Sequence, residues 1–118
     1  MDRVVPGQLA VGSKLVTAGE ANLTGHFPGA PLLPGVLIVE ALAQLAGVAA
    51  ADSGTIEGRL AAVHEFRFRR PVLPGDRLML SVEVVRRIGH VVRVRGVASV
   101  GDEVAADGEL TITIGPST

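Results

Sequence analysis

The fold is decided by residues 36–51, which read Val-Leu-Ile-Val-Glu-Ala-Leu-Ala-Gln-Leu-Ala-Gly-Val-Ala-Ala-Ala. The alanine and leucine content of this stretch favours an α-helix, and the preceding Pro34-Gly35 pair suits a helix N-terminus, where proline is tolerated. Only Glu40 and Gln44 within it are polar. Because a helix that is apolar on every side has to be buried on every side, we expect the rest of the chain to wrap around it.

Strands are predicted on both sides of this helix. A loose alternation of apolar residues predicts a short strand at 8–16, and clearer patterns predict strands at 62–69, 77–87, 91–100 and 103–114. Consecutive strands joined by short turns pair antiparallel. We therefore predict an α+β fold in which one long central helix is wrapped by a curled antiparallel sheet of five to six strands.

Composition limits the class of protein. The 118 residues fit a single domain, 1–118, and 47% hydrophobic residues together with 15 glycines leave an apolar surplus that we expect in a subunit interface or a lipophilic pocket. A net charge of −1 gives no drive toward nucleic acid, and the lack of cysteine excludes disulfides and thiolate metal sites. The central helix is too short for a bilayer, which needs about 20 residues, and no secretory signal opens the chain. We expect a cytoplasmic protein.

Glu40 is the one carboxylate within the apolar helix. Desolvation by its neighbours should favour the protonated form, which can act as a general acid. Gln44 follows one helical turn later and is placed to orient it. The alternative is a structural hydrogen bond from Glu40 to backbone amides, and the pattern alone does not decide between the two.

A second group of candidates precedes the helix. His26 lies in the constrained loop Gly25-His26-Phe27-Pro28-Gly29, and imidazole is the natural proton acceptor near pH 7, although a lone histidine is more often structural. The helix start at Gly35 and Val36 supplies unpaired amides that can polarise a carbonyl, or it is an ordinary helix start. We expect the other histidines, His64 and His90, to be structural or exposed.

The strand at 62–69 carries aromatic and charged residues in alternation. Strict alternation predicts that His64, Phe66 and Phe68 share one face while Glu65 and Arg67 share the other.

Arginine dominates the second half of the chain. Period-2 spacing places Arg67 with Arg69, and Arg93 with Arg95, on shared faces. Such a stripe is either a solvated sheet face or a surface for a partner that carries a phosphate or an acidic helix. The sequence contains no glycine-rich nucleotide loop, no histidine pair at metal spacing and no Gly-x-Ser-x-Gly elbow.

Two segments resemble a known family. Residues 25–44, Gly-His-Phe-Pro-Gly-Ala-Pro-Leu-Leu-Pro-Gly-Val-Leu-Ile-Val-Glu-Ala-Leu-Ala-Gln, resemble the active-site segment of the β-hydroxyacyl-acyl-carrier-protein dehydratases of bacterial fatty acid synthesis. Residues 67–76, Arg-Phe-Arg-Arg-Pro-Val-Leu-Pro-Gly-Asp, are similar to the second signature of that family. With the following strands, the likeness covers about residues 20–114.

The resemblance implies a hotdog fold and a homodimer, in which the histidine of one subunit faces the glutamate of the other; such dimers often assemble further into trimers of dimers. Carried over by position, His26 is the catalytic base and Glu40 its partner acid. Gly35 donates its amide to the thioester carbonyl, and Gln44 supports Glu40. The residues expected to contact substrate are Gly35, Val36, Gln44, Phe27 and Phe68.

The implied reaction is dehydration of (3R)-3-hydroxyacyl thioesters to trans-2-enoyl thioesters, in fatty acid or related lipid or polyketide synthesis, without metal or redox cofactor. The partner is an acyl carrier protein or coenzyme A thioester, received by the arginine stripe. The sequence lacks the family's N-terminal helical stretch and has no tyrosine, so Phe66 or Phe68 would serve as the aromatic gate of the acyl tunnel. Two alternatives remain: a hotdog acyl thioesterase and a non-catalytic acyl-thioester binding module.

Overall fold

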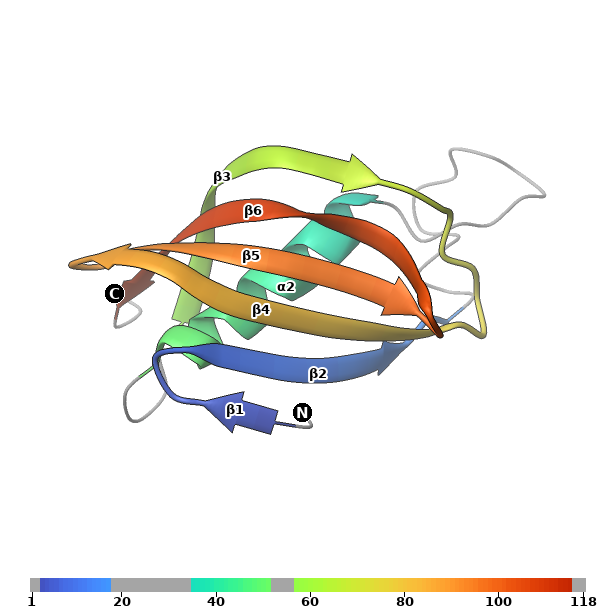
Figure 1. The fold of residues 1–118 in the computed structure, drawn as a ribbon, viewed down its shortest axis with the longest axis horizontal. Coiled ribbons are helices and arrows are strands. Elements are labelled where there is room, and N and C mark those ends of the chain that lie inside the picture. The colour runs from blue at the N-terminus through green and yellow to red at the C-terminus, as the bar shows by residue number, and fades with distance from the viewer. Residues whose placement is uncertain (1–2, 18–34, 52–56, 116–118) are drawn as a thin grey trace.

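The computed structural model of the chain describes residues 3–17, 35–51 and 57–115. One helix and six strands lie in these ranges: β1 (Arg3–Val5), β2 (Leu9–Leu15), α2 (Gly35–Ala50), β3 (Glu57–Phe68), β4 (Arg77–Ile88), β5 (Val91–Val100) and β6 (Glu103–Gly115). The strands form one antiparallel sheet in the order β1-β2-β4-β5-β6-β3. The sheet curls over α2, which runs along its concave side (Figure 1). This is the predicted α+β architecture, and the predicted helix and strands are confirmed to within a few residues, except that β3 begins earlier and β1 was not expected.

The core lies between α2 and the inner face of the sheet. Leu42 projects from the middle of the helix and is fully buried, as are Leu110 and Ile112 on β6, and burial of each such side chain contributes about 1.5–3 kcal/mol. Two glycines allow the helix to approach closely. A Cβ at Gly96 on β5 would lie 3.2 Å from Leu42 Cδ1, and a Cβ at Gly58 on β3 would meet helix backbone at 2.8 Å.

The C-terminal end of α2 is tied to the sheet. The last carbonyl groups of a helix have no partner within the helix, and here they receive donors from two other segments. The backbone N–H of Gly7, between β1 and β2, donates to the carbonyl oxygen of Ala49 over 2.8 Å. Arg87 on β4 donates from Nη1 to the carbonyl oxygen of Ala50 over 3.0 Å. These contacts hold the C-terminal end of α2 against the sheet. Because the helix is a rigid rod, they also determine where its N-terminal end lies.

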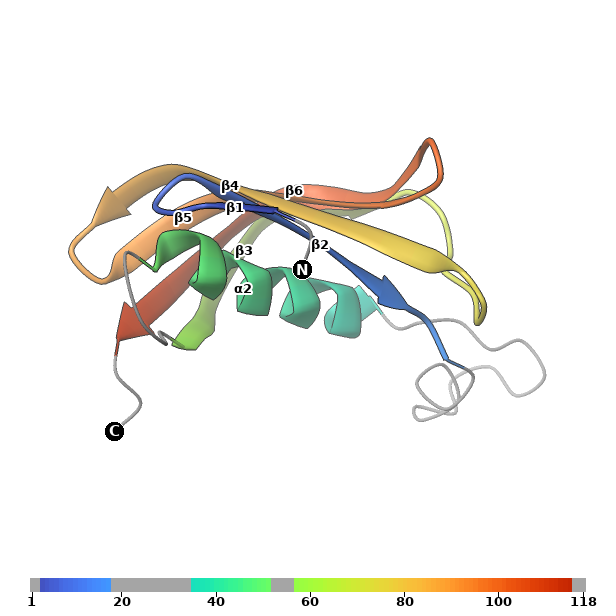
Figure 2. The same cartoon turned by 90° about the horizontal axis from the view of Figure 1, so that it is seen from below.

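The sheet covers only part of the helix surface. Figure 2 shows α2 lying against the concave side of the sheet, with no described element on its far side. Val36 is 68% exposed, and Glu40 and Gln44 are exposed as well. Because these residues are four apart, they form one stripe along the helix. The prediction that the helix is buried on every side is therefore wrong for a single chain, since the sheet reaches around only the opposite side.

A β-bulge changes the expected alternation of β3. His64 pairs with Glu109 of β6, whereas Arg67 pairs with Asp107, so the register shifts between them. Glu65, within the bulge, has a φ of 47°, which is unusual for a residue other than glycine. The bulge puts His64 on the outer face of the sheet and leaves Phe68 on the inner face. The prediction that His64 shares a face with Phe66 and Phe68 is therefore wrong, because an extra residue reverses the alternation.

Candidate active site

The N-terminal end of α2 meets the end of β3. Gly35 is the first residue of the helix, so the N–H groups of this first turn have no acceptor within the helix. The ring of Phe68 lies directly against Gly35, and an ideal Cβ at Gly35 would lie 2.6 Å from Phe68 Cε1. Phe68 also contacts Phe66, with ring centroids 5.3 Å apart. Glycine is therefore the residue that lets an aromatic ring lie over the start of the helix.

A cavity of about 450 Å³ opens at this junction. The helix contributes Gly35 and Ile38, and the chain leaving β3 contributes the rest of the lining, which is Phe68, Arg69, Arg70, Pro71 and Val72. Apolar walls beside backbone amides that have no acceptor within the helix suit an acyl chain whose carbonyl oxygen accepts a hydrogen bond from the helix start. The sequence predicted Gly35 and Phe68 in such a pocket but not Ile38, Pro71 or Val72. The only sequence signal for the latter two was their place within the second family-like segment.

Glu40 and Gln44 lie side by side on the exposed stripe of α2. Gln44 Nε2 donates a hydrogen bond to Glu40 Oε1 over 3.0 Å, which is the contact expected from residues four apart on a helix. Both side chains are exposed in the single chain. The predicted desolvation of Glu40 by its own helix is therefore wrong, because its apolar neighbours turn toward the sheet while the carboxyl group points away from it.

The predicted histidine is not placed. His26 and Phe27 lie outside the described residues, and their roles stay predictions. The other two histidines match expectation: His64 is partly buried with its Nε2 2.8 Å from Thr111 Oγ1, and His90 is exposed.

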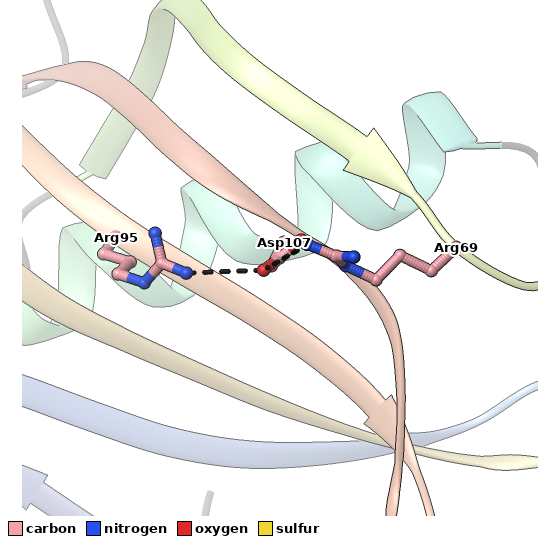
Figure 3. Close-up of polar contacts among 3 residues, drawn as sticks. All are labelled: Arg69, Arg95 and Asp107. Carbon is pink, nitrogen blue, oxygen red and sulfur yellow. Dashed lines mark hydrogen bonds and ion pairs between the residues drawn. The ribbon is translucent and has the colours of Figure 1, made fainter.

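The arginine stripe is largely an ion-paired sheet surface. Arg69 and Arg95 both donate to Asp107, over 2.9 and 3.3 Å (Figure 3), and Arg93 pairs with Glu109. The hydrogen bond from Arg69 holds the pKa of Asp107 below its usual range, against a smaller opposing effect of desolvation, and the charges of Arg69, Arg95 and Arg67 add to the lowering. The same bond raises the pKa of Arg69. Carboxylates on the same face thus already neutralise much of the stripe.

The described parts of the chain carry neither a cluster of metal-ligating side chains nor a membrane-spanning helix. No group of three or more His, Cys, Asp or Glu side chains there could hold a metal ion. Within the same residues, no helix has the length and apolar character needed to cross a membrane.

Comparison with known proteins gives the family. A family model described as a FabA-like domain matches residues 2–109. The chain belongs to the FabA-like family. It is 46% identical over 121 residues to the 3-hydroxyacyl-[acyl-carrier-protein] dehydratase FabZ of Moorella thermoacetica, covering 98% of this chain and 85% of that protein. It is 50% identical over 110 residues to the FabZ of Bacillus pumilus, covering 91% and 76%.

Solved structures show that this FabA-like chain has the hotdog fold. The fluoroacetyl-CoA thioesterase FlK superposes with a TM-score of 0.78 at 14% identity, covering 96% of this chain and 89% of that one. A thioesterase superfamily member from Thermus thermophilus superposes with a TM-score of 0.77 at 21% identity, covering 98% and 87%. At these identities the likeness concerns the fold alone, and the family assignment of the FabA-like chain rests on the sequence matches.

Proposed function

We propose that this protein dehydrates (3R)-3-hydroxyacyl thioesters to trans-2-enoyl thioesters. The observation that carries the proposal is the apolar cavity at the start of α2, where Gly35 presents its amide beneath Phe68, in a chain whose relatives are named as dehydratases of this type. The proposed substrate is carried by an acyl carrier protein, the carrier in those names. Arg69, which lines the cavity, would contact the phosphate of the carrier's pantetheine arm.

The proposed reaction divides the work among three groups. His26 takes the proton at C2 of the substrate, and Glu40 protonates the hydroxyl group that leaves C3, so that one water departs and a C2–C3 double bond forms. The Gly35 amide and the helix dipole stabilise the negative charge that develops on the thioester oxygen. Elimination of water changes no net oxidation state, and for this reason the proposal includes no redox cofactor.

The exposed stripe of α2 supports a homodimer as the working unit. A carboxyl group in water is an ordinary acid, so a Glu40 that protonates a poor leaving group must be sheltered by another chain. Exposed apolar side chains occur on the helix and on the strand that contacts it: Val36 belongs to the stripe, and Leu60 and Val63 lie on β3. In addition, β3 is an edge strand of the sheet, and such an edge is open to pairing with a second chain. Assembly beyond the dimer and the cytoplasmic location stay predictions.

The dimer proposal has its own measurement. Val63→Glu places a charge on the exposed apolar surface without disturbing the buried core, so we expect sedimentation to show a shift toward monomer together with loss of turnover. Val85→Glu, an equally exposed valine on β4, is the matched control. A wild-type chain that stays monomeric while turning over substrate would refute the dimer.

The function is tested with 3-hydroxybutyryl and crotonyl thioesters. Dehydration and its reversal change the enoyl absorbance, whereas a thioesterase releases free thiol with no such change. We expect His26→Ala and Glu40→Gln each to lower turnover by at least about 100-fold, while His90→Ala and Glu83→Gln, which alter exposed side chains elsewhere, leave it unchanged. Thiol release without enoyl change would indicate the thioesterase. Thioester binding that none of the four variants alters, with no turnover, would indicate the binding module.

A further inference from the structure

Arg70 connects two turns at one end of the sheet. Its side chain is only 28% exposed, and its guanidinium contacts three acceptors on two segments of the chain. Nη1 donates to Glu103 Oε2, at the start of β6, over 3.2 Å. Nη2 lies 3.8 Å from Asp76 Oδ2, just before β4, and Nε donates to the carbonyl oxygen of Pro71 over 3.3 Å.

The segment that Arg70 holds forms one wall of the cavity. Pro71 and Val72 line it, yet the segment between β3 and β4 belongs to no strand and so has no ladder of hydrogen bonds to fix it. Other contacts hold its two ends. At the near end the backbone N–H groups of Arg69 and Arg70 donate to the carbonyl oxygen of Ala105 over 2.7 and 3.3 Å. The backbone N–H of Leu73 donates to Asp76 Oδ2 over 2.9 Å, and that of Gly75 donates to the carbonyl oxygen of Val16 over 2.9 Å.

Asp76 and Arg70 together link this wall of the cavity to the end of the sheet. Oδ2 of Asp76 accepts from Leu73 N–H and faces the Arg70 guanidinium, while the same guanidinium is held by Glu103 across the sheet end. A guanidinium is a planar fork with five donors and can bridge two carboxylates, whereas an ammonium is a single point of charge. Beyond the backbone bonds to Ala105, the segment that carries Pro71 is thus tied to Glu103 and Asp76 by a side-chain bridge that an arginine completes better than a lysine.

We propose that Arg70 is a positioning residue that sets the acyl-binding wall of the cavity, an inference that rests on the proposed dehydratase function. It touches neither the helix-start amide nor the candidate acid. Its loss should therefore weaken binding of the acyl chain more than it slows the chemical step. A misplacement of about 1 Å can cost 100-fold in rate when it affects the reacting atoms. For a shifted wall at a distance from them, we expect KM to rise about tenfold and kcat to change less than about twofold.

The test compares variants of the full chain in the enoyl-absorbance assay with short and long 3-hydroxyacyl thioesters. Arg70→Gln should raise KM, and more for an eight-carbon than for a four-carbon acyl group. Arg70→Lys should restore part of the loss. Glu103→Gln should reproduce the effect, and the double variant Arg70→Gln/Glu103→Gln should be no worse than Arg70→Gln alone, because both changes break one bridge. Arg86→Gln, at an exposed arginine of β4, is the matched control.

The outcomes separate this inference from the function on which it rests. Wild-type kinetic constants in Arg70→Gln, or a KM change with no dependence on acyl length, would overturn the positioning role while leaving the dehydratase intact. Absence of dehydration by the wild-type chain would instead overturn the proposed function. In that case hydrogen exchange still tests whether Arg70 holds the wall in place, since the Leu73 amide should exchange faster in Arg70→Gln than in Arg86→Gln. If Arg70→Gln does not fold, Glu103→Gln decides in its place, because it removes the same bridge by changing an exposed carboxylate.

Discussion

Replacement of Gly35 by alanine tests whether the helix start takes part in the reaction. The φ angle of Gly35 is not in the left-handed region, so alanine fits the backbone there without strain. Its Cβ would nevertheless lie 2.6 and 2.7 Å from Phe68 Cε1 and Cζ. Because the phenyl ring is 55% exposed, it can turn away toward solvent at little cost in folding free energy.

The size of the effect on activity follows from that geometry. Carbon atoms in contact lie about 3.5–4.0 Å apart, so the ring or the helix start must move by about 1 Å to admit the new methyl group. A shift of the helix start would also move the amide of residue 35 away from the proposed position of the thioester oxygen. A displacement of about 1 Å at a reacting centre costs about 100-fold in rate, and loss of one oxyanion donor costs about 100- to 1,000-fold in kcat. We therefore expect Gly35→Ala to lower kcat by at least about 100-fold while the melting temperature stays within a few degrees.

The assay is enoyl formation from 3-hydroxybutyryl thioester, with thermal unfolding followed by circular dichroism. Gly12→Ala on β2 is the control, since its Cβ would meet Leu45 Cδ1 at an ordinary contact distance of 3.6 Å. Full activity in Gly35→Ala would refute the participation of this helix start. A large loss of stability would show instead that the clash with Phe68 is not relieved by rotation of the ring.

Two further predictions concern the fold. Gly58→Ala should destabilise the protein by about 1–3 kcal/mol, because its Cβ would lie 2.8 Å from Gly47 Cα and 3.0 Å from the Ala43 carbonyl oxygen, and backbone cannot rotate away; an unchanged midpoint in urea would contradict this. The pKa of Asp107 is lowered chiefly by the hydrogen bond from Arg69. The contribution of Asp107 to stability should therefore be complete above its usual pKa near 3.8, and it should be lost as the pH falls through the lower pKa that Asp107 has in the folded protein. The melting temperatures of wild type and Asp107→Asn should accordingly differ at pH 7, and the difference should shrink as the pH falls below 3.8. A difference that does not shrink down to the lowest pH at which both proteins stay folded would refute the assignment.

The regular elements could be predicted from the sequence because their signals are local. The apolar run at 36–51 and the alternation along the later strands specify a helix and strands almost residue by residue. The bulge in β3 could not be predicted, since it depends on Glu65, a residue type that rarely adopts a positive φ. The strand β1 is too short to give a periodic signal.

The sequence singled out Gly35 and Phe68, which line the cavity, but it did not indicate the environment of Glu40. An apolar composition indicates that a helix face is covered, but it does not indicate what covers that face. A helix buried by its own sheet and a helix buried by a second chain therefore have the same sequence pattern around Glu40. Arg70 was one of many arginines in the second half, and its partner Glu103 is 33 positions away. Such a bridge is visible only once the two turns are placed side by side.

The extra residue in β3 also has a bearing on how this chain can vary in length. Loss of Glu65 alone would remove the extra residue and let Phe66 pair with Gly108, while Arg67 would stay opposite Asp107 and Phe68 opposite Ala106. Phe68 would thus keep its place on the inner face of the sheet, and Arg67 its place on the outer face. The bulge therefore allows β3 to differ by one residue in length among relatives without exchanging its two faces, which a regular strand does not allow.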